Sequence, residues 1–221
     1  MSDKPTIAVI GGTGAEGGGL ALRLANAGYP VVIGSRDAAR AAAAAEAINA
    51  TIGGSAASGS DGTAAAAAAE IVLLAVPFSG QQATALALAD ELRGKILVDA
   101  TVPLVPPKVS RVQLPDGGSA VAKLQELLGP EVRVVSAFQN VSAHHLKDLD
   151  HAVDCDVLVC GDDGEACETV IALAAAIGLR AFYAGPAVNS VAAEALTSVL
   201  ITINRRHKVS GSGIRITGLE R

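Results

Sequence analysis

The sequence predicts an α/β protein with a Rossmann-type, doubly wound parallel sheet, and two observations lead to that fold class. A glycine-rich run at residues 11–19 lies between an apolar stretch of strand length, residues 6–10, and an apolar helical stretch, residues 19–27. Beyond it, apolar runs alternate with alanine-rich helical segments along most of the 221 residues. Such alternation is typical of parallel strands joined by helices that cover both faces of a sheet.

The individual elements follow in chain order. We expect further strands at residues 29–34, 70–76, 95–100, 133–138, 156–160 and 179–184, and helices at 38–50, 64–69, 80–92, 119–128, 164–177 and 187–204. The continuous apolar run at 70–76 is typical of a strand that is buried on both faces. Residues 53–62 are small, polar and glycine-rich, so they predict a surface loop of weak structure.

The chain divides into two predicted domains. Residues 1–143 form a nucleotide-binding Rossmann domain, and residues 144–221 form a smaller α/β C-terminal domain. The last predicted helix carries an apolar face that suits packing onto the body of the protein or onto a second subunit. The residues of that face are Ala192, Leu196, Leu200 and Ile203.

Charge and composition argue against nucleic-acid and membrane partners. The formal net charge is −5 and the basic residues are dispersed, which is not the footprint of a nucleic-acid-binding protein. Two Tyr, three Phe and no Trp leave few aromatic rings on which bases could stack. The N-terminus has no signal pattern, and we find no apolar run of the roughly 18 to 20 residues that span a bilayer. We therefore expect a cytoplasmic protein.

No metal site is predicted. Cys155, Cys160 and Cys167 are odd in number and lack the paired spacing of zinc sites or of a disulfide framework. The histidines and aspartates of residues 144–151 do not have the spacing of a known ligand set. We interpret that segment as a solvated polar loop.

The glycine run fits a dinucleotide-binding turn. Gly12, Gly14 and Gly17 match the G-x-G-x-x-G pattern, between a strand and a helix as the pattern requires. Gly12 is expected to permit the tight turn, Gly14 to let backbone amides approach a pyrophosphate, and Gly17 to let the helix pack closely on the strand. The positive end of the helix would then face the phosphates.

The end of the second predicted strand selects the nucleotide. An acidic residue there would bind the ribose 2′-hydroxyl of NAD, but this position is occupied by Ser35 and Arg36. Ser35 can donate to a 2′-phosphate, Arg36 can bind it with two donors, and Arg40 lies one helical turn further on the same face. In the alternative, Asp37 binds the ribose, although it is better placed to cap the next helix. We therefore predict NADP.

Several short motifs, in this order, resemble the NADPH-dependent coenzyme F420 reductases, also called F420H2:NADP oxidoreductases. The motifs are the glycine turn at 10–14, the Gly34-Ser35-Arg36 clamp, and residues 76–78, 134–138, 160–163 and 184–190. The resemblance covers essentially the whole chain. It implies a hydride transfer between NADP(H) and the deazaflavin coenzyme F420, in a cleft that the small C-terminal domain completes, and it implies a homodimer.

The resemblance also implies the site residues. The predicted NADP-binding residues are Gly12, Thr13, Gly14, Ala15, Glu16, Gly17, Ser35, Arg36, Arg40, Pro77, Phe78, Gln82, Leu104 and Ala143. The predicted F420-binding residues are Pro103, Gln139, Val141 and Asn189. No catalytic acid or base is predicted, because the two cofactors carry the reaction and the protein supplies alignment and a dry cleft.

Two positions depart from the pattern of some members, which have histidine and isoleucine where Gln139 and Val141 stand here. A glutamine keeps the ability to form hydrogen bonds but cannot carry a charge near neutral pH. We expect Gln139 to orient the deazaflavin.

Two other functions are consistent with the same nucleotide-binding half. One is an NADPH-dependent flavin reductase that uses an ordinary flavin as acceptor. The other is a non-catalytic NADP(H)-sensing protein, which would bind NADPH tightly and turn over no acceptor. The proline-bounded loops at 76–78 and 101–107 follow the ends of predicted strands, where this fold places ligands, and they favour an enzyme.

Overall fold

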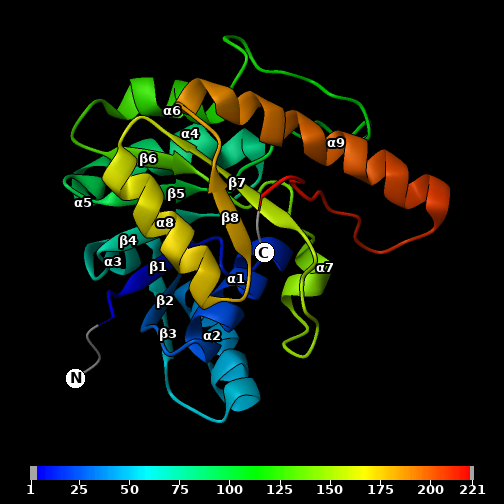
Figure 1. Ribbon diagram of the computed structural model, residues 1–221. Coiled ribbons are helices and arrows are strands. Elements are labelled where there is room, and N and C mark those ends of the chain that lie inside the picture. The colour runs from blue at the N-terminus through cyan, green and yellow to red at the C-terminus, as the bar shows by residue number, and fades with distance from the viewer. Residues whose placement is uncertain (1–3, 220–221) are drawn as a thin grey trace.

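The computed structural model describes residues 4–219, whose strands form one eight-stranded sheet. The strand order is β3-β2-β1-β4-β5-β6-β7-β8, and every neighbouring pair is parallel except β6 and β7 (Figure 1). This order confirms the predicted Rossmann-type fold. The strands are β1 Ile7–Ile10, β2 Val31–Ser35, β3 Ala57–Asp61, β4 Ile71–Leu74, β5 Ile96–Asp99, β6 Arg133–Ser136, β7 Asp156–Gly161 and β8 Arg180–Tyr183.

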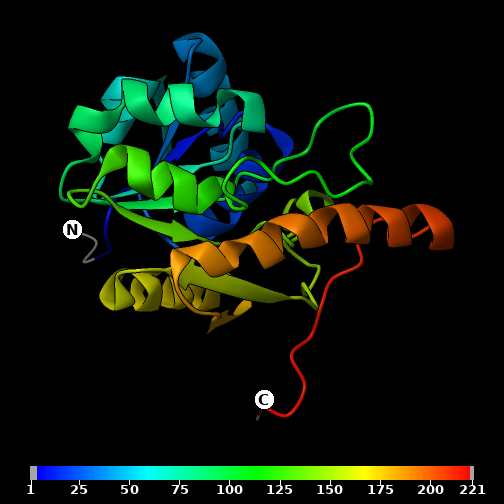
Figure 2. The ribbon, with the colours of Figure 1, turned by 90° about the horizontal axis from the view of Figure 1, so that it is seen from above.

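Helices cover both faces of the sheet (Figure 2). Because successive side chains of a strand point to opposite faces, Ile7 and Val9 of β1 belong to one apolar core and Ala8 and Ile10 to the other. The first core is closed by α1 Ala15–Asn26, α2 Ala38–Ile52, α7 Ala143–Leu146 and α8 Gly164–Ala176. The second is closed by α3 Gly62–Ala67, α4 Gln81–Ala87, α5 Ala89–Leu92 and α6 Ala120–Leu128.

The prediction of a loop at residues 53–62 is wrong, because Ala57–Asp61 forms strand β3, paired in parallel with β2. The small residues of this strand are required by packing. A Cβ on Gly59 would lie 2.2 Å from the carbonyl carbon of Ala41 in α2. The Asn49 side chain also fixes the start of the strand, since it donates to the Ala57 carbonyl and accepts from the Ala57 amide at 2.8 and 2.9 Å.

The last third of the chain continues the same sheet. Strand β7 runs antiparallel to β6, with Ser136 opposite Cys160, and β8 is parallel to β7. The segment interpreted as a solvated polar loop, residues 144–151, instead begins within the short helix α7, Ala143–Leu146, whose last residue is fully buried. The two-domain division at residue 143 stays a prediction.

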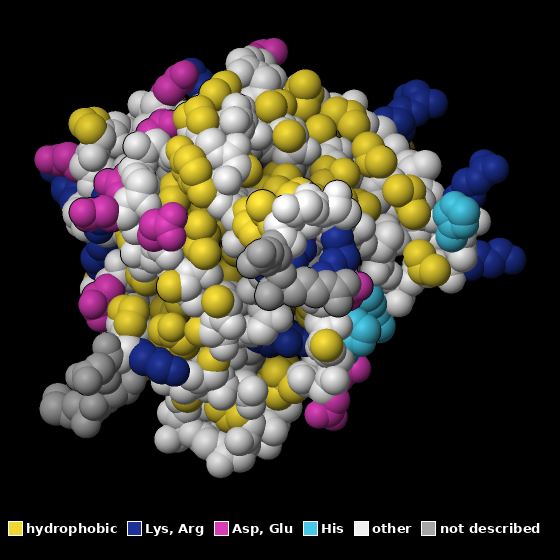
Figure 3. All heavy atoms as spheres, in the orientation of Figure 1, with side chains coloured by type: hydrophobic (Ala, Val, Ile, Leu, Met, Phe, Trp, Pro, Cys, Tyr) yellow, Lys and Arg dark blue, Asp and Glu magenta, His cyan; other side chains and the backbone are white. Residues whose placement is uncertain are grey.

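Helix α9, Ser190–His207, follows the single turn η2, Ala187–Asn189, and its outer end extends beyond the body (Figures 1 and 2). Of the four residues of the predicted apolar face, Leu200 is buried against the body, Leu196 is half-buried, and Ala192 and Ile203 are exposed in the single chain. The face against the body instead carries Ala193, Glu194 and Ser198. Hydrophobic side chains lie along the outer surface of α9 and give way to basic side chains at its far end (Figure 3).

We expected no apolar run long enough to span a bilayer. The helical segment Ala187–His207 differs from this expectation, because by length and composition it could cross a membrane. The segment has 21 residues, and its most apolar stretch has a mean hydropathy of 1.3. Within the protein, 33% of that stretch is buried. Helices of globular proteins also meet these criteria, so the finding is weak support for a span.

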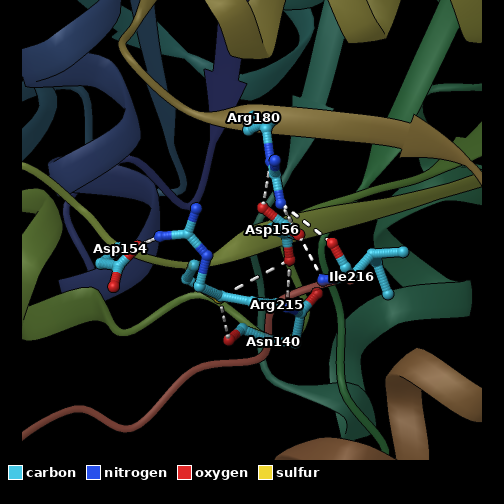
Figure 4. Close-up of polar contacts among 7 residues, drawn as sticks. Asn140, Asp154, Asp156, Arg180, Arg215 and Ile216 are labelled. Atoms are coloured by element: carbon cyan, nitrogen blue, oxygen red, sulfur yellow. Dashed lines mark hydrogen bonds and ion pairs between the residues drawn. The ribbon is translucent and has the colours of Figure 1, made fainter. Parts of the chain in front are cut away.

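A buried carboxylate fixes residues 214–216 against strand β7. Asp156, at the start of β7, accepts from Arg180 Nε at 2.7 Å and Nη2 at 2.6 Å and from the Ile216 amide (Figure 4). The Asp156 amide donates to the Ile214 carbonyl at 2.8 Å, and Asn140 Nδ2 donates to the Asp156 carbonyl at 2.7 Å. The hydrogen bonds from Arg180 hold the pKa of Asp156 below its ordinary value.

Replacing Asp156 with asparagine is expected to lower the free energy of unfolding by about 1 to 3 kcal/mol at pH 7, because it leaves charged and amide donors without their carboxylate. The folded-state pKa is depressed, so the carboxylate stabilises the fold above its ordinary pKa of 3.8, and this stabilisation is lost as the pH falls through the folded-state value. Urea unfolding at pH 7 and pH 3 should therefore show a difference from wild type that narrows at the lower pH.

Asp154→Asn is the matched control for this variant. Asp154 pairs with Arg215 beside the same segment, but its side chain is 73% exposed. We expect the free energy of unfolding of this variant to differ from that of the wild type by no more than about 1 kcal/mol. Equal losses in the two variants would contradict the role assigned to Asp156.

Candidate functional site

The glycine turn is formed by close approach of backbone to backbone. Gly11 has φ +85°, and a Cβ there would lie 2.3 Å from the Ala75 carbonyl oxygen. The left-handed residue of the turn is therefore Gly11, which corrects the role that was expected of Gly12. A Cβ on Gly17 would lie 2.7 Å from the Gly11 oxygen, so α1 packs on the turn as predicted. Gly12 instead lies against Ile33, 3.0 Å from where its Cβ would be.

The N-terminus of α1 presents its amides at the surface of this turn. Gly14 is the N-cap and is exposed, and none of the described side chains caps the helix. The first amides of a helix need an acceptor, and the helix dipole favours an anionic one. This end of α1 can thus bind a phosphate group, as the glycine pattern predicts.

A cavity of approximately 960 Å³ lies on one side of the glycine turn. Thr13, Ser35, Arg36 and Arg40 line it, and both arginines are exposed to solvent. The structure thus brings the predicted 2′-phosphate residues together. Asp37 accepts from the amides of Ala39 and Arg40 at 3.0 and 3.2 Å, which confirms its prediction as the cap of α2. The sequence analysis missed a further part of the wall, residues 61–63, because it assigned the preceding strand to a loop.

A second cavity, of approximately 720 Å³, lies on the other side of the turn. Gly14 and residues 75–77 line both cavities, so the two cavities adjoin at the turn, and together they are called the groove below. The second cavity contains most of the remaining predicted site residues, namely Ala15, Glu16, Pro77, Phe78, Leu104, Gln139, Val141 and Ala143. Most of the rest of its wall is apolar, with Val102, Leu200 and Ile201 among the lining residues.

Five predicted residues are not among the described residues that line either cavity, and two of them, Gly12 and Gly17, are buried in the packing of the turn. Gln82 is exposed on α4, and Pro103 is buried within its loop. Asn189 lies in η2, where its side chain donates to the Ala184 carbonyl at 2.9 Å. The proposed cofactor contacts of these residues stay predictions.

A polar cluster under the second cavity was not predicted. Asp99, at the carboxyl end of β5, accepts from Gln81 Nε2 at 2.5 Å and from the Thr101 amide at 2.8 Å, and its carbonyl accepts from Gln139 Nε2 at 2.7 Å. Burial raises the pKa of Asp99 to about 6. The sequence did contain one indication of this cluster, because Asp99 directly follows the apolar residues 96–98. The sequence could not show that Gln81 rather than Gln82 is the buried glutamine, because this depends on how the helix is rotated about its axis.

Unpartnered polar atoms mark the same wall. Thr101 Oγ1, Gln139 Oε1 and Asn140 Oδ1 are buried and have no hydrogen-bond partner within residues 4–219. All three residues line the second cavity. Beside them, buried Phe138 adopts a left-handed φ of 76°, a strained conformation of the kind found at ligand sites. The wall is therefore apolar with a few available hydrogen-bonding groups, a composition typical of pockets for flat cofactors.

A buried arginine fixes the segment that follows Ala143, a residue of the cavity wall. Arg23 of α1 donates through Nε to the Leu146 carbonyl at 3.0 Å and through Nη2 to the His145 carbonyl at 2.9 Å. It also donates to the carbonyls of Asp148 and His151 at 2.6 and 2.9 Å. The histidine rings of residues 144–151 lie close together, but across the described part of the chain no group of three or more ligand side chains could hold a metal ion.

The parallel sheet, the glycine turn at the N-terminus of α1 and the basic end of β2 define a Rossmann-type dinucleotide-binding protein. The sequence model of the family "NADP oxidoreductase coenzyme F420-dependent" matches residues 6–103. A Methanocaldococcus jannaschii protein named F420-dependent NADP reductase is 43% identical, over 97% of this chain and 99% of its own length. The protein of that name from Methanothermobacter thermautotrophicus is 42% identical, over 96% of this chain and 95% of its own.

A solved structure agrees with these relatives. The crystal structure of a proposed F420-dependent NADP reductase from Arthrobacter sp. FB24 superimposes with a TM-score of 0.80 at 28% identity, covering 96% of this chain and 99% of its own. This chain belongs to the F420-dependent NADP reductase family.

Proposed function

We propose that this protein is an oxidoreductase that transfers a hydride between NADP(H) and coenzyme F420. The observation that carries the proposal is the groove, in which a cavity with a basic end at Ser35, Arg36 and Arg40 adjoins a largely apolar cavity at the glycine turn. Membership of the F420-dependent NADP reductase family supports the same two cofactors.

The residues at the basic end and at the turn fit NADP. Arg36 and Arg40 supply positive charge for a 2′-phosphate, and Ser35 supplies a hydroxyl donor. The exposed Gly14 lets a pyrophosphate reach the first amides of α1, because no Cβ lies in the way. The nicotinamide half then enters the second cavity, where Ala15, Glu16, Phe78, Leu104 and Ala143 are its proposed neighbours.

The remainder of the second cavity fits a flat deazaflavin. When both cofactors are bound, they supply the redox chemistry, a hydride exchange between C5 of the deazaflavin and C4 of the nicotinamide. Gln139 is held by its bond to the Asp99 carbonyl, so its unpartnered oxygen is available to orient the ring. Phe78, Val141 and Leu200 exclude water from the space between them. The chain thus contributes alignment rather than a proton donor.

We also propose a homodimer, located in the cytoplasm and without nucleic-acid or membrane partners. The apolar outer surface of α9 supports the dimer (Figure 3), since Val199 and Ile203 remain 44% and 39% exposed in the single chain. Light scattering that gives twice the mass of one chain is the expected result. A monomer at micromolar concentration would contradict the dimer.

The function is tested by mixing the purified protein with NADPH and either F420 or FMN, and following the absorbance of each acceptor. We expect reduction of F420 and, in reverse, reduction of NADP⁺ by F420H2. Turnover of FMN alone would instead favour the flavin reductase, and tight NADPH binding without turnover of either acceptor would favour the sensing protein.

A further inference from the structure

Glu16 has an unusual environment for a carboxyl group. It lies in the first turn of α1 and lines the second cavity, where it is the single ionisable side chain among the described lining residues. Its Oε1 atom is buried and has no hydrogen-bond partner within residues 4–219. A buried carboxylate oxygen without a partner is costly, so it points to a ligand that supplies one.

The position of Glu16 along the groove identifies that ligand. The first cavity takes the 2′-phosphate end and Gly14 takes the pyrophosphate, so a residue two positions further on, which lines the second cavity only, faces the nicotinamide half. The nicotinamide ring is cationic in NADP⁺ and neutral in NADPH. A carboxylate in this poorly solvated cavity would attract only the oxidised form.

We propose that Glu16 sets the preference of this site for oxidised over reduced NADP through the charge of its carboxylate. This inference rests on the proposed NADP site. When the carboxylate is ionised, it stabilises bound NADP⁺ relative to NADPH, and when it is protonated, that preference is lost. The residue is a determinant of cofactor redox state rather than a donor in the hydride transfer.

The surroundings make this charge dependent on pH near neutrality. Burial raises the pKa of Glu16 to about 8. Among the charged or titratable groups on the elements around the cavity, Arg23 binds the carbonyls of residues 145–151, Asp99 binds Gln81 and Thr101, Glu194 binds the start of α6, and Arg205 binds Ser110. The other such groups next to lining residues on the 101–112 loop and at the end of α9 are exposed to solvent, namely Lys108, Arg111, Arg206 and His207. His145 stacks on His151. The loops at 75–79 and 100–106 contain no titratable side chain.

The test measures the dissociation constants of NADP⁺ and NADPH by equilibrium titration from pH 6 to pH 9.5, without F420. In the wild-type protein the ratio Kd(NADP⁺)/Kd(NADPH) should fall about tenfold or more as the pH rises through 8. In Glu16→Gln and Glu16→Leu the ratio should stay within about twofold. Titration of the 2′-phosphate and repulsion from the pyrophosphate affect both forms equally, so both effects cancel in the ratio.

The matched control is Glu165→Gln. Glu165 lies in the first turn of the long helix α8, as Glu16 does in α1, but it is exposed and does not line the groove. This variant should keep the wild-type dependence on pH. A ratio that is independent of pH in the wild type, or equally dependent on pH in both Glu16 variants, overturns the proposal. If wild-type protein binds neither NADP⁺ nor NADPH, the proposed function fails as well.

Discussion

Replacing Arg36 with alanine raises the KM for NADPH roughly 30- to 150-fold and leaves the KM for NADH within about twofold. The estimate follows from the loss of a charge-assisted contact of about 2 to 3 kcal/mol, since each 1.4 kcal/mol is a factor of ten. Arg36 is exposed at the mouth of the first cavity, so the substitution leaves the fold intact. Only the 2′-phosphate distinguishes the two nucleotides, and the loss should therefore be confined to NADPH.

Two further variants sharpen this measurement. Arg36→Lys should give an intermediate loss, because lysine keeps the charge but not the paired donors. Arg93→Ala removes an exposed arginine that pairs with Asp90 and Glu131 away from the groove, and it should leave both KM values unchanged. If Arg36→Ala raises both KM values by the same factor, Arg36 does not bind the 2′-phosphate.

Replacing Glu194 with glutamine lowers the free energy of unfolding by about 3 kcal/mol or more, which corresponds to roughly 6 to 12 °C in Tm for a chain of this size. Glu194 is 1% exposed, on the inner face of α9. Its carboxylate accepts from the Ala120 and Val121 amides at 2.9 and 3.1 Å and from Ser119 Oγ at 2.8 Å. A side chain of one helix thus binds the N-terminal amides of another, α6, where the helix dipole also favours a negative charge.

An amide in place of this carboxylate would turn an NH₂ group toward at least one of the same donors, leaving that donor buried and without an acceptor. Glu126→Gln is the matched control, because Glu126 is 69% exposed and pairs only with Lys123 on the surface of α6. That change should stay within about 0.5 kcal/mol. Thermal melts and urea unfolding of both variants measure the difference, and a loss in Glu194→Gln no larger than in Glu126→Gln would contradict the role assigned to Glu194.

The elements that could be predicted from the sequence are those whose pattern is local. The apolar runs that become β1, β4 and β5 are continuous because both faces of these strands are buried, and helices lie between them. Asp37 was correctly predicted as a cap because its acceptor and the amides it binds are adjacent in sequence. The groove residues of the glycine turn and of the end of β2 could be predicted for the same reason.

What could not be predicted depends on contacts between distant segments. Strand β3 has the composition of a loop, because α2 approaches Gly59 too closely for any side chain. In the sequence, Arg23 and Glu194 resemble charged residues on the exposed face of a helix. In the fold, Arg23 donates to carbonyls of residues 145–151, and Glu194 accepts from the first amides of α6. The requirement for glycine at position 11 also depends on a distant segment, because the carbonyl of Ala75, which follows β4, lies where a Cβ of residue 11 would be.

The reversed strand β7 has a consequence for how the protein is completed during synthesis. Because β7 runs antiparallel to β6, its first residue, Asp156, lies beside Asn140 at the edge where the groove opens, and it holds the returning tail there. The first cavity is built from residues 10–88 only, whereas the wall of the second includes Ser212. On the ribosome, all the residues of the first cavity are therefore present long before the wall of the second cavity is complete, because that wall also needs residues as late as Ser212.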